Sequence, residues 1–283
     1  MRTGTYDPGE VRSIIHGNKK GNGIEASLIG EQGCGKTNGL VQIALERKSN
    51  GVNDVIVWRG AEDCQWSYLL NYDVDLKFWI KKGLDYELID RNAEEMTRLS
   101  KYGEIEKWND PRNLVDKLNN DYINVVQTIP HSTNKEITLQ FCDDWKGLFE
   151  ELSKRMWSRG ISVFFDELRD LAKPGRSGNF WSKMFSLGSA LRKGRKNNIS
   201  YFFSMHDPAD IFWDIRNKIR YKIYMKGAAK ESTSQIRKNL SNLDDGEGVV
   251  EGSQFEPFQF EYGGDEKMLR ARIDVPEIGE GGS

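Results

Sequence analysis

Short apolar runs alternate with longer amphipathic segments along most of this chain. Runs rich in β-branched and aromatic residues predict strands at Ile24–Ile29, Asp54–Trp58, Tyr86–Ile89, Ile123–Ile129, Ile161–Phe165 and Tyr201–Met205. The last two runs are apolar almost throughout, which is typical of parallel strands that are covered on both faces.

The segments between these runs carry apolar residues at helical spacing. A helix is predicted over Lys36–Arg47, with Leu40, Ile43 and Ala44 on one face. A second is predicted over Trp145–Trp157, and a third, between the last two strands, carries Phe185, Leu187 and Leu191. Strands that alternate with helices in this way predict an α/β fold, in which a mainly parallel central sheet is flanked by helices.

One domain accounts for most of the 283 residues. We expect an N-terminal extension over 1–20, the α/β domain over 21–262 and a partly disordered C-terminal tail over 263–283, which ends in EIGEGGS. The composition turns polar and charged over about 91–120, and we interpret this stretch as an insertion on the rim of the sheet.

The first predicted strand leads into GEQGCGKTNG, whose spacing from Gly30 to Thr37 reads G-x-x-x-x-G-K-T. A strand before the pattern and a helix after it are the context of a phosphate-binding loop. Its backbone N–H groups and the helix dipole attract phosphate, Lys36 reaches the β and γ phosphates, and Thr37 ligates Mg²⁺. The predicted nucleotide contacts are Gly30, Glu31, Gln32, Gly33, Cys34, Gly35, Lys36, Thr37 and Asn38. Cys34 fits best as a small filler.

An acidic pair, Asp166 and Glu167, follows the apolar run ISVFF. A carboxylate at the carboxyl end of a buried strand, beside a phosphate loop, can hold Mg²⁺, which is the role predicted for Asp166. Glu167 would then polarise the water that attacks the γ-phosphate. A pair of acids that caps a helix N-terminus is the structural alternative. The pair favours ATP hydrolysis over phosphoryl transfer to a small molecule, since a carboxylate that activates water is of no use to a kinase, which must exclude water.

The overall charge gives no sign of a strongly basic, nucleic-acid-binding surface. With 41 basic and 43 acidic side chains the net charge is −2, so the chain carries no global field for nucleic acid. Three widely spaced cysteines fit a reducing compartment and form no metal pattern. No secretory signal and no apolar run of membrane-spanning length is visible. We therefore expect a cytoplasmic protein without a membrane span.

The segment after the acidic pair contains LGSALRKGRK, then the strand end SMH, and later LSNLDDGEG. With the glycine loop and the acidic pair, this order of motifs resembles the FtsK/HerA superfamily of DNA-pumping ATPases. Its members follow the acid pair with an R-x-G-R-K-like helix end, then a strand that ends in a polar triplet, and later an L-x-x-L-x-x-G-E strand entry. The matching residues here are Arg192, Gly194, Arg195 and Lys196, then Ser204, Met205 and His206, then Leu240, Leu243, Gly246 and Glu247. The resemblance spans Ile24 to about Gly252.

This resemblance implies a RecA-like P-loop NTPase that uses ATP and Mg²⁺ and works as a homo-oligomeric ring, a hexamer. It implies catalytic roles for Lys36, Glu167 and two further residues. Arg195, with Arg192 as the alternative, would be an arginine finger directed at a neighbouring subunit. His206 occupies the place of the family's usual glutamine sensor; a strand-end histidine bonded to a loop is the other interpretation.

The implied function is movement of double-stranded DNA. The short chain looks most like a viral genome-packaging ATPase, which would act in the host cytoplasm or on the virion with a capsid or portal-vertex protein as a partner. The alternative is a nucleotide-dependent switch or assembly ATPase, of the filamentous-phage extrusion type, that does not translocate DNA. A guanine-specific enzyme is disfavoured because the chain has no N-K-x-D motif, and a small-molecule kinase ranks third.

Two further patterns remain open. The basic residues Arg216, Lys218, Arg220 and Lys222 could line a central DNA channel or be alternate charges on a half-exposed strand. Tryptophans at 58, 66, 79, 108, 181 and 213 include candidates for base stacking, but core and subunit contacts are the preferred interpretation.

Overall fold

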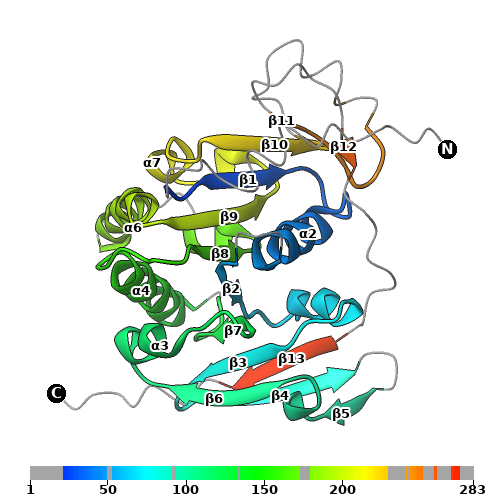
Figure 1. Ribbon diagram of the computed structural model, residues 1–283, viewed down its shortest axis with the longest axis vertical. Helices are drawn as coiled ribbons and strands as arrows, with labels where there is room; N and C mark the ends of the chain where they lie inside the picture. Colours follow the sequence, from blue (N-terminus) through cyan, green and yellow to red (C-terminus); the bar gives the residue numbers. More distant parts are fainter. Residues whose placement is uncertain are drawn as a thin grey trace.

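The computed structural model describes residues 22–49, 53–90, 94–132, 134–172, 179–228, 240, 243–250, 258–259 and 269–274. A central sheet passes through the molecule (Figure 1). Within the described residues it has ten strands, in the order β12 (Phe258–Gln259), β11 (Glu247–Val250), β10 (Tyr221–Met225), β1 (Glu25–Ile29), β9 (Ile199–Met205), β8 (Ile161–Phe165), β2 (Val55–Arg59), β7 (Ile123–Gln127), β3 (Leu76–Lys81) and β6 (Glu104–Trp108).

The strands from β10 to β6 pair in parallel, whereas β11 joins β10 and β12 by antiparallel pairing. The predicted α/β class with a mainly parallel sheet is therefore confirmed. Since all these parallel strands run the same way, the residues that follow β1, β2, β8 and β9 meet at one edge of the sheet. That edge carries the candidate site.

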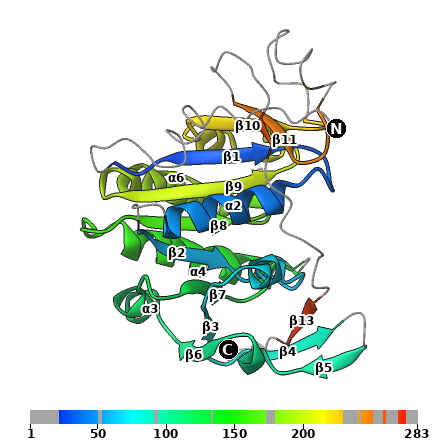
Figure 2. The same ribbon diagram turned by 45° about the vertical axis from the view of Figure 1, so that its right-hand side comes forward.

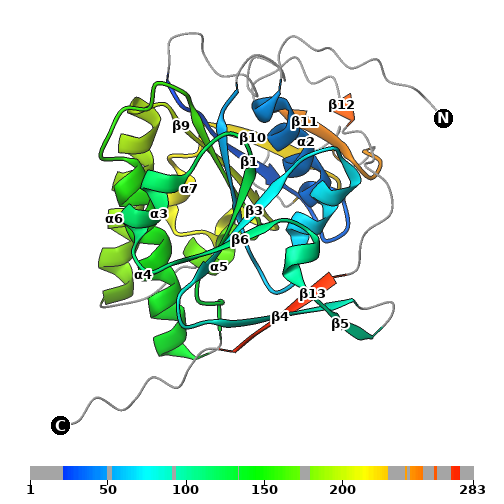
Figure 3. The ribbon, with the colours of Figure 1, turned by 60° about the horizontal axis from the view of Figure 1, so that its bottom comes forward.

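Helices cover both faces of the sheet (Figures 2 and 3). One face packs against α2 (Lys36–Lys48) and the short helix η1 (Gln65–Asn71). The other face packs against α3 (Pro111–Lys117), α4 (Lys135–Leu152), α5 (Leu168–Ala172), α6 (Asn179–Lys196) and α7 (Trp213–Arg216). The short turns η2 (Leu99–Lys101) and η3 (Pro208–Asp210) complete the described helical segments.

Side chains of the central strands alternate between two cores. On β8, Val163 and Phe165 join the core under α4 and α6, and Phe164 joins the core under α2. The adjacent strand repeats the pattern, with Phe203 on the first side and Phe202 on the second. Because both faces are covered, these strands are apolar at most positions, and their buried serines are hydrogen-bonded. This explains the continuous runs in the sequence.

A small sheet lies beside the outer strands of the large one (Figure 3). It is antiparallel, in the order β13 (Leu269–Asp274), β4 (Asp85–Asp90) and β5 (Glu95–Thr97). The strand predicted at Tyr86–Ile89 therefore exists, but it belongs to this sheet. The stretch predicted as a rim insertion, 91–120, contributes β6 to the edge of the central sheet. The domain boundaries remain a prediction, and 1–20 lies outside the described residues.

One predicted helix begins and ends at the wrong residues. The helix predicted over Trp145–Trp157 is α4, which starts ten residues earlier and stops at Leu152. The side chain of Asn134 accepts hydrogen bonds from the N–H groups of Glu136 and Ile137 and thereby caps its N-terminus. Met156, which falls inside the predicted range, lies beyond the helix and is 75% exposed.

The four basic residues considered for a channel do not share a strand. Arg216 ends α7, Lys218 and Arg220 lie in the connection, and only Lys222 is on β10. Lys218 forms an ion pair with Asp214 of the same turn. The interpretation of these residues as alternate charges on one half-exposed strand is therefore wrong, because a helix and a loop supply most of the charges. Trp58, Trp66, Trp79 and Trp108 are buried in the core.

Candidate active site

The phosphate loop joins β1 to α2, as predicted from its strand and helix flanks. Gly33 and Gly35 have φ values of 82° and 94°, in the left-handed region that glycine enters without strain. A Cβ on Gly35 would also lie 3.2 Å from the Cα of Gly246. The turn before β11 packs against the glycine loop, since the N–H of Gly246 donates to the carbonyl of Cys34 at 3.0 Å. Two predicted motifs that are far apart in sequence therefore lie in contact.

Cys34 fills space inside the loop. It is 1% exposed, and burial raises the pKa of its thiol, which disfavours the reactive thiolate. Its Sγ lies only 2.6 Å from where a Cβ on Gly30 would stand, so the two residues pack closely. The preference for a small filler over redox chemistry agrees with this packing.

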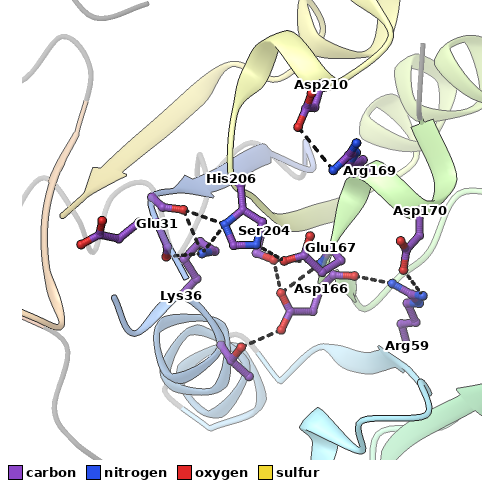
Figure 4. A network of polar contacts seen from close by, with 12 residues as sticks. Glu31, Lys36, Arg59, Asp166, Glu167, Arg169, Asp170, Ser204, His206 and Asp210 are labelled. Carbon is purple, nitrogen blue, oxygen red and sulfur yellow. Dashed lines mark hydrogen bonds and ion pairs between the residues drawn. The ribbon is translucent and has the colours of Figure 1, made fainter. Parts of the chain in front are cut away.

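Lys36 is buried at the start of α2, with 6% of its surface exposed. Its Nζ donates to the carbonyl oxygens of Gly30 at 2.9 Å and Glu31 at 2.7 Å (Figure 4). It also lies 3.4 Å from Nδ1 of His206. A buried ammonium needs such acceptors, and phosphate oxygens are stronger partners for it than neutral carbonyls.

Thr37 and Asp166 come from opposite sides of the site and meet. The hydroxyl of Thr37 donates to Oδ2 of Asp166 at 2.7 Å. Asp166 follows β8 directly and is 2% exposed. A hydroxyl and a carboxylate are hard oxygen ligands of the kind that Mg²⁺ prefers. The donor set therefore fits the predicted magnesium ion, which would take its other ligands from phosphate and water.

Glu167 and His206 lie side by side at the carboxyl ends of β8 and β9. Nε2 of His206 is 2.9 Å from Oε1 of Glu167, and its Nδ1 is 3.2 Å from the carbonyl of Gly30. Burial raises the pKa of Glu167, and the charge of Asp166 adds to this, while His206 and Lys36 act in the opposite direction. A carboxyl with a raised pKa is a stronger base when ionised.

Arg195 does not join this cluster within its own chain. It lies in the last turn of α6, and its Nε lies 3.7 Å from Oε1 of Glu25, at the amino end of β1. The phosphate loop leaves the other end of this strand, roughly 16 Å away for its five residues. Burial raises the pKa of Glu25 to about 7, despite the opposing charges of Arg195 and Arg220. Arg192 lies one turn earlier on α6 and is exposed.

Sequence reasoning missed two residues of the site. Ser204 was named only as part of a triplet, yet its hydroxyl bonds Oδ1 of Asp166 and accepts from the N–H of Glu167 at 2.9 Å. Arg59 follows the apolar run of β2, as Asp166 follows that of β8. Position after a parallel strand was the signal that could have found it.

A cleft of about 270 Å³ opens next to Glu167. Its walls come from the carboxyl ends of β2 and β7 and from α5, and they include Arg59, Asp63, Gln127, His131 and Asp170. Burial, and then the neighbouring charge of Asp166, raise the pKa of Asp63. The site thus borders a polar depression on the side of β2.

A parallel sheet with a glycine loop after β1, an acid pair after β8 and a histidine after β9 is the arrangement of a P-loop NTPase fold. No known protein-family description matches the chain, and no curated protein matches its sequence. Solved structures do share the fold. The genome packaging NTPase B204 of Sulfolobus turreted icosahedral virus 2 aligns with a TM-score of 0.51 and 10% identity, over 86% of this chain and 98% of that one.

Two further solved structures align similarly. VirB4 of Thermoanaerobacter pseudethanolicus gives a TM-score of 0.53 at 12% identity, over 88% of this chain and 92% of that one. The bacterial conjugative coupling protein TrwB gives 0.54 at 11%, over 84% of both chains. These alignments confirm the predicted fold, a mainly parallel sheet flanked by helices, which the chain shares with these three structures. No helix in the described part of the chain has both the length and the apolar character for crossing a bilayer.

Proposed function

We propose that this protein is an ATP-hydrolysing motor that translocates double-stranded DNA and packages a viral genome into a capsid. The observation that carries the proposal is the convergence of Lys36, Thr37, Asp166, Glu167 and His206 at one edge of the sheet. These residues supply an anion cradle, metal ligands and a base within a few ångströms of one another. The fold shared with a viral packaging NTPase supports the choice of cargo.

Each residue has a part in hydrolysis. The loop N–H groups and Lys36 hold the β and γ phosphates of ATP. Thr37 and Asp166 would hold Mg²⁺, and the ion would neutralise charge on the phosphate oxygens. Glu167 accepts a proton from the attacking water. His206 contacts Glu167 through Nε2 and keeps this carboxylate directed at the loop. It also acts as the sensor that distinguishes a bound γ-phosphate from its absence.

The place of Arg195 supports the proposed ring. A guanidinium at the amino end of β1 is too far from the loop of its own subunit, so as an arginine finger it serves a neighbouring one. Hydrolysis then requires a closed homo-oligomer, which we propose to be a hexamer around duplex DNA. A capsid or portal-vertex protein would anchor it in the host cytoplasm or on the virion. Arg192 is the alternative finger.

A triplex-displacement assay tests translocation. A motor that moves along duplex DNA strips off a third strand paired in its path, so we expect ATP-dependent release from triplex on a duplex track by the wild-type protein. The same track with Lys36→Ala, or with a non-hydrolysable ATP analogue, controls for passive dissociation. Hydrolysis of ATP without strand release would contradict the motor and support the nucleotide-dependent switch instead.

A further inference from the structure

Arg59 is a buried cation that the proposed mechanism does not use. It is the last residue of β2, and only 6% of its surface is exposed. A buried guanidinium is costly unless its donors find partners. Its Nη1 donates to the backbone carbonyl of Asp166 at 2.6 Å, and its Nη2 donates to Oδ2 of Asp170 at 2.6 Å (Figure 4). Both partners flank Glu167 in sequence.

The guanidinium is fixed in place by aromatic rings as well as by these bonds. Its central carbon lies 4.6 Å from the ring centroid of Phe165 and 5.3 Å from that of Phe141. The planar fork of arginine can stack on rings while it donates in two fixed directions, which the ammonium of lysine cannot do. The position therefore depends on arginine geometry and not on charge alone.

Glu167 needs such support because its backbone is strained. Its φ is 55°, in the left-handed region that non-glycine residues enter at a cost of about 1–2 kcal/mol. The peptide between Asp166 and Glu167 is held at both ends. Its carbonyl accepts from Arg59, and its N–H donates to Oγ of Ser204 at 2.9 Å. A fixed peptide plane fixes the direction in which the side chain of Glu167 leaves the chain.

The following peptide is tied to the same arginine. The N–H of Asp170 donates to the carbonyl of Glu167 at 3.0 Å, closing the first turn toward α5. Nη2 of Arg59 holds the carboxylate of that same Asp170. The guanidinium thus grips the turn on both sides of Glu167, from a strand that lies next to β8 in the sheet.

We propose that Arg59 is a positioning residue that holds Glu167 in the strained conformation required for its role as base. This inference rests on the proposed function, because it assigns Arg59 to hydrolysis through Glu167. Loss of Arg59 should lower kcat and leave the affinity for nucleotide unchanged. The described hydrogen bonds of Arg59 go to the turn at Glu167, and none of them goes to the phosphate loop.

The test compares Arg59→Lys with Arg155→Lys. Arg155 is a half-exposed arginine that pairs with Asp116 and stacks on Trp157, so it controls for the substitution itself. Because small misplacements of catalytic groups cost up to about 100-fold in rate, we expect Arg59→Lys to lower kcat by about 10- to 100-fold, with the KM for ATP within about twofold. Arg155→Lys should match the wild type in both parameters.

A double-mutant cycle separates positioning from general stability. If Arg59 acts through Glu167, then Arg59→Lys should add less than about twofold to the loss in a Glu167→Gln background. If Arg59→Lys fails to fold, Asp170→Asn, which keeps an acceptor for the guanidinium but removes its charge, takes its place in the same cycle. An additive loss, or an unchanged kcat beside a lower melting temperature, overturns the inference. A wild-type protein without ATPase activity would instead refute the proposed function.

Discussion

Replacing Glu167 by glutamine should reduce ATP hydrolysis by at least about 100-fold while ATP binding persists, since a positioned general base contributes about 10²–10⁴ in rate. The amide keeps the size of the side chain and an oxygen that His206 can bond at Nε2. It cannot take a proton from water. Steady-state phosphate release and equilibrium nucleotide binding, measured on the same sample, separate the two effects.

The fall of the wild-type hydrolysis rate at acid pH also tests Glu167 as the base. Burial raises the pKa of Glu167 above its ordinary 4.5, so the base becomes protonated, and the rate falls, at a higher pH than an unperturbed glutamate would give. Glu95→Gln, an exposed acid on β5 of the small sheet, is the matched control and should retain the wild-type rate. Hydrolysis by Glu167→Gln at the wild-type rate would exclude Glu167 as the base.

Replacing Lys36 by alanine should abolish nucleotide binding and hydrolysis together. The ammonium is buried and carries the only positive side-chain charge in the loop itself. Charge-assisted hydrogen bonds to it contribute about 1.5–3 kcal/mol each, so loss of two or more weakens binding by at least about 100-fold. Fluorescence titration with a labelled adenine nucleotide measures the affinity.

Folding must be checked in the same variant, because Lys36 also satisfies the carbonyls of Gly30 and Glu31. Thermal unfolding without nucleotide reports this directly. Lys82→Ala removes an exposed lysine from the turn after β3 and should change neither property. Retention of wild-type affinity by a folded Lys36→Ala protein would show that the glycine loop does not hold the phosphates.

The central elements of the fold could be predicted from the sequence where short-range patterns determine them. The loop from Gly30 to Thr37, the buried runs of β8 and β9 and the start of α2 depend on neighbouring residues alone. The outer strand β6 was missed because its residues, EIEKW, are mostly charged and only Trp108 is buried. An edge strand with one covered side gives a weaker apolar signal.

The site was predictable in its parts but not in its connections. Lys36, Thr37, Asp166 and Glu167 were expected together, and the structure brings them together with His206. The contact of Arg59 with Asp166 joins residues 107 positions apart. It exists because β2 lies next to β8, and that order is fixed by packing across the whole sheet, which no local pattern contains.

The most direct test of the account is steady-state ATP hydrolysis by the wild-type chain, with and without duplex DNA. A motor that couples the Lys36–Glu167 cluster to its cargo should release phosphate faster as duplex is added, until the rings are saturated, and the same preparation should sediment as a closed multimer in ATP. A rate indifferent to DNA, from a chain that stays monomeric, would contradict the account.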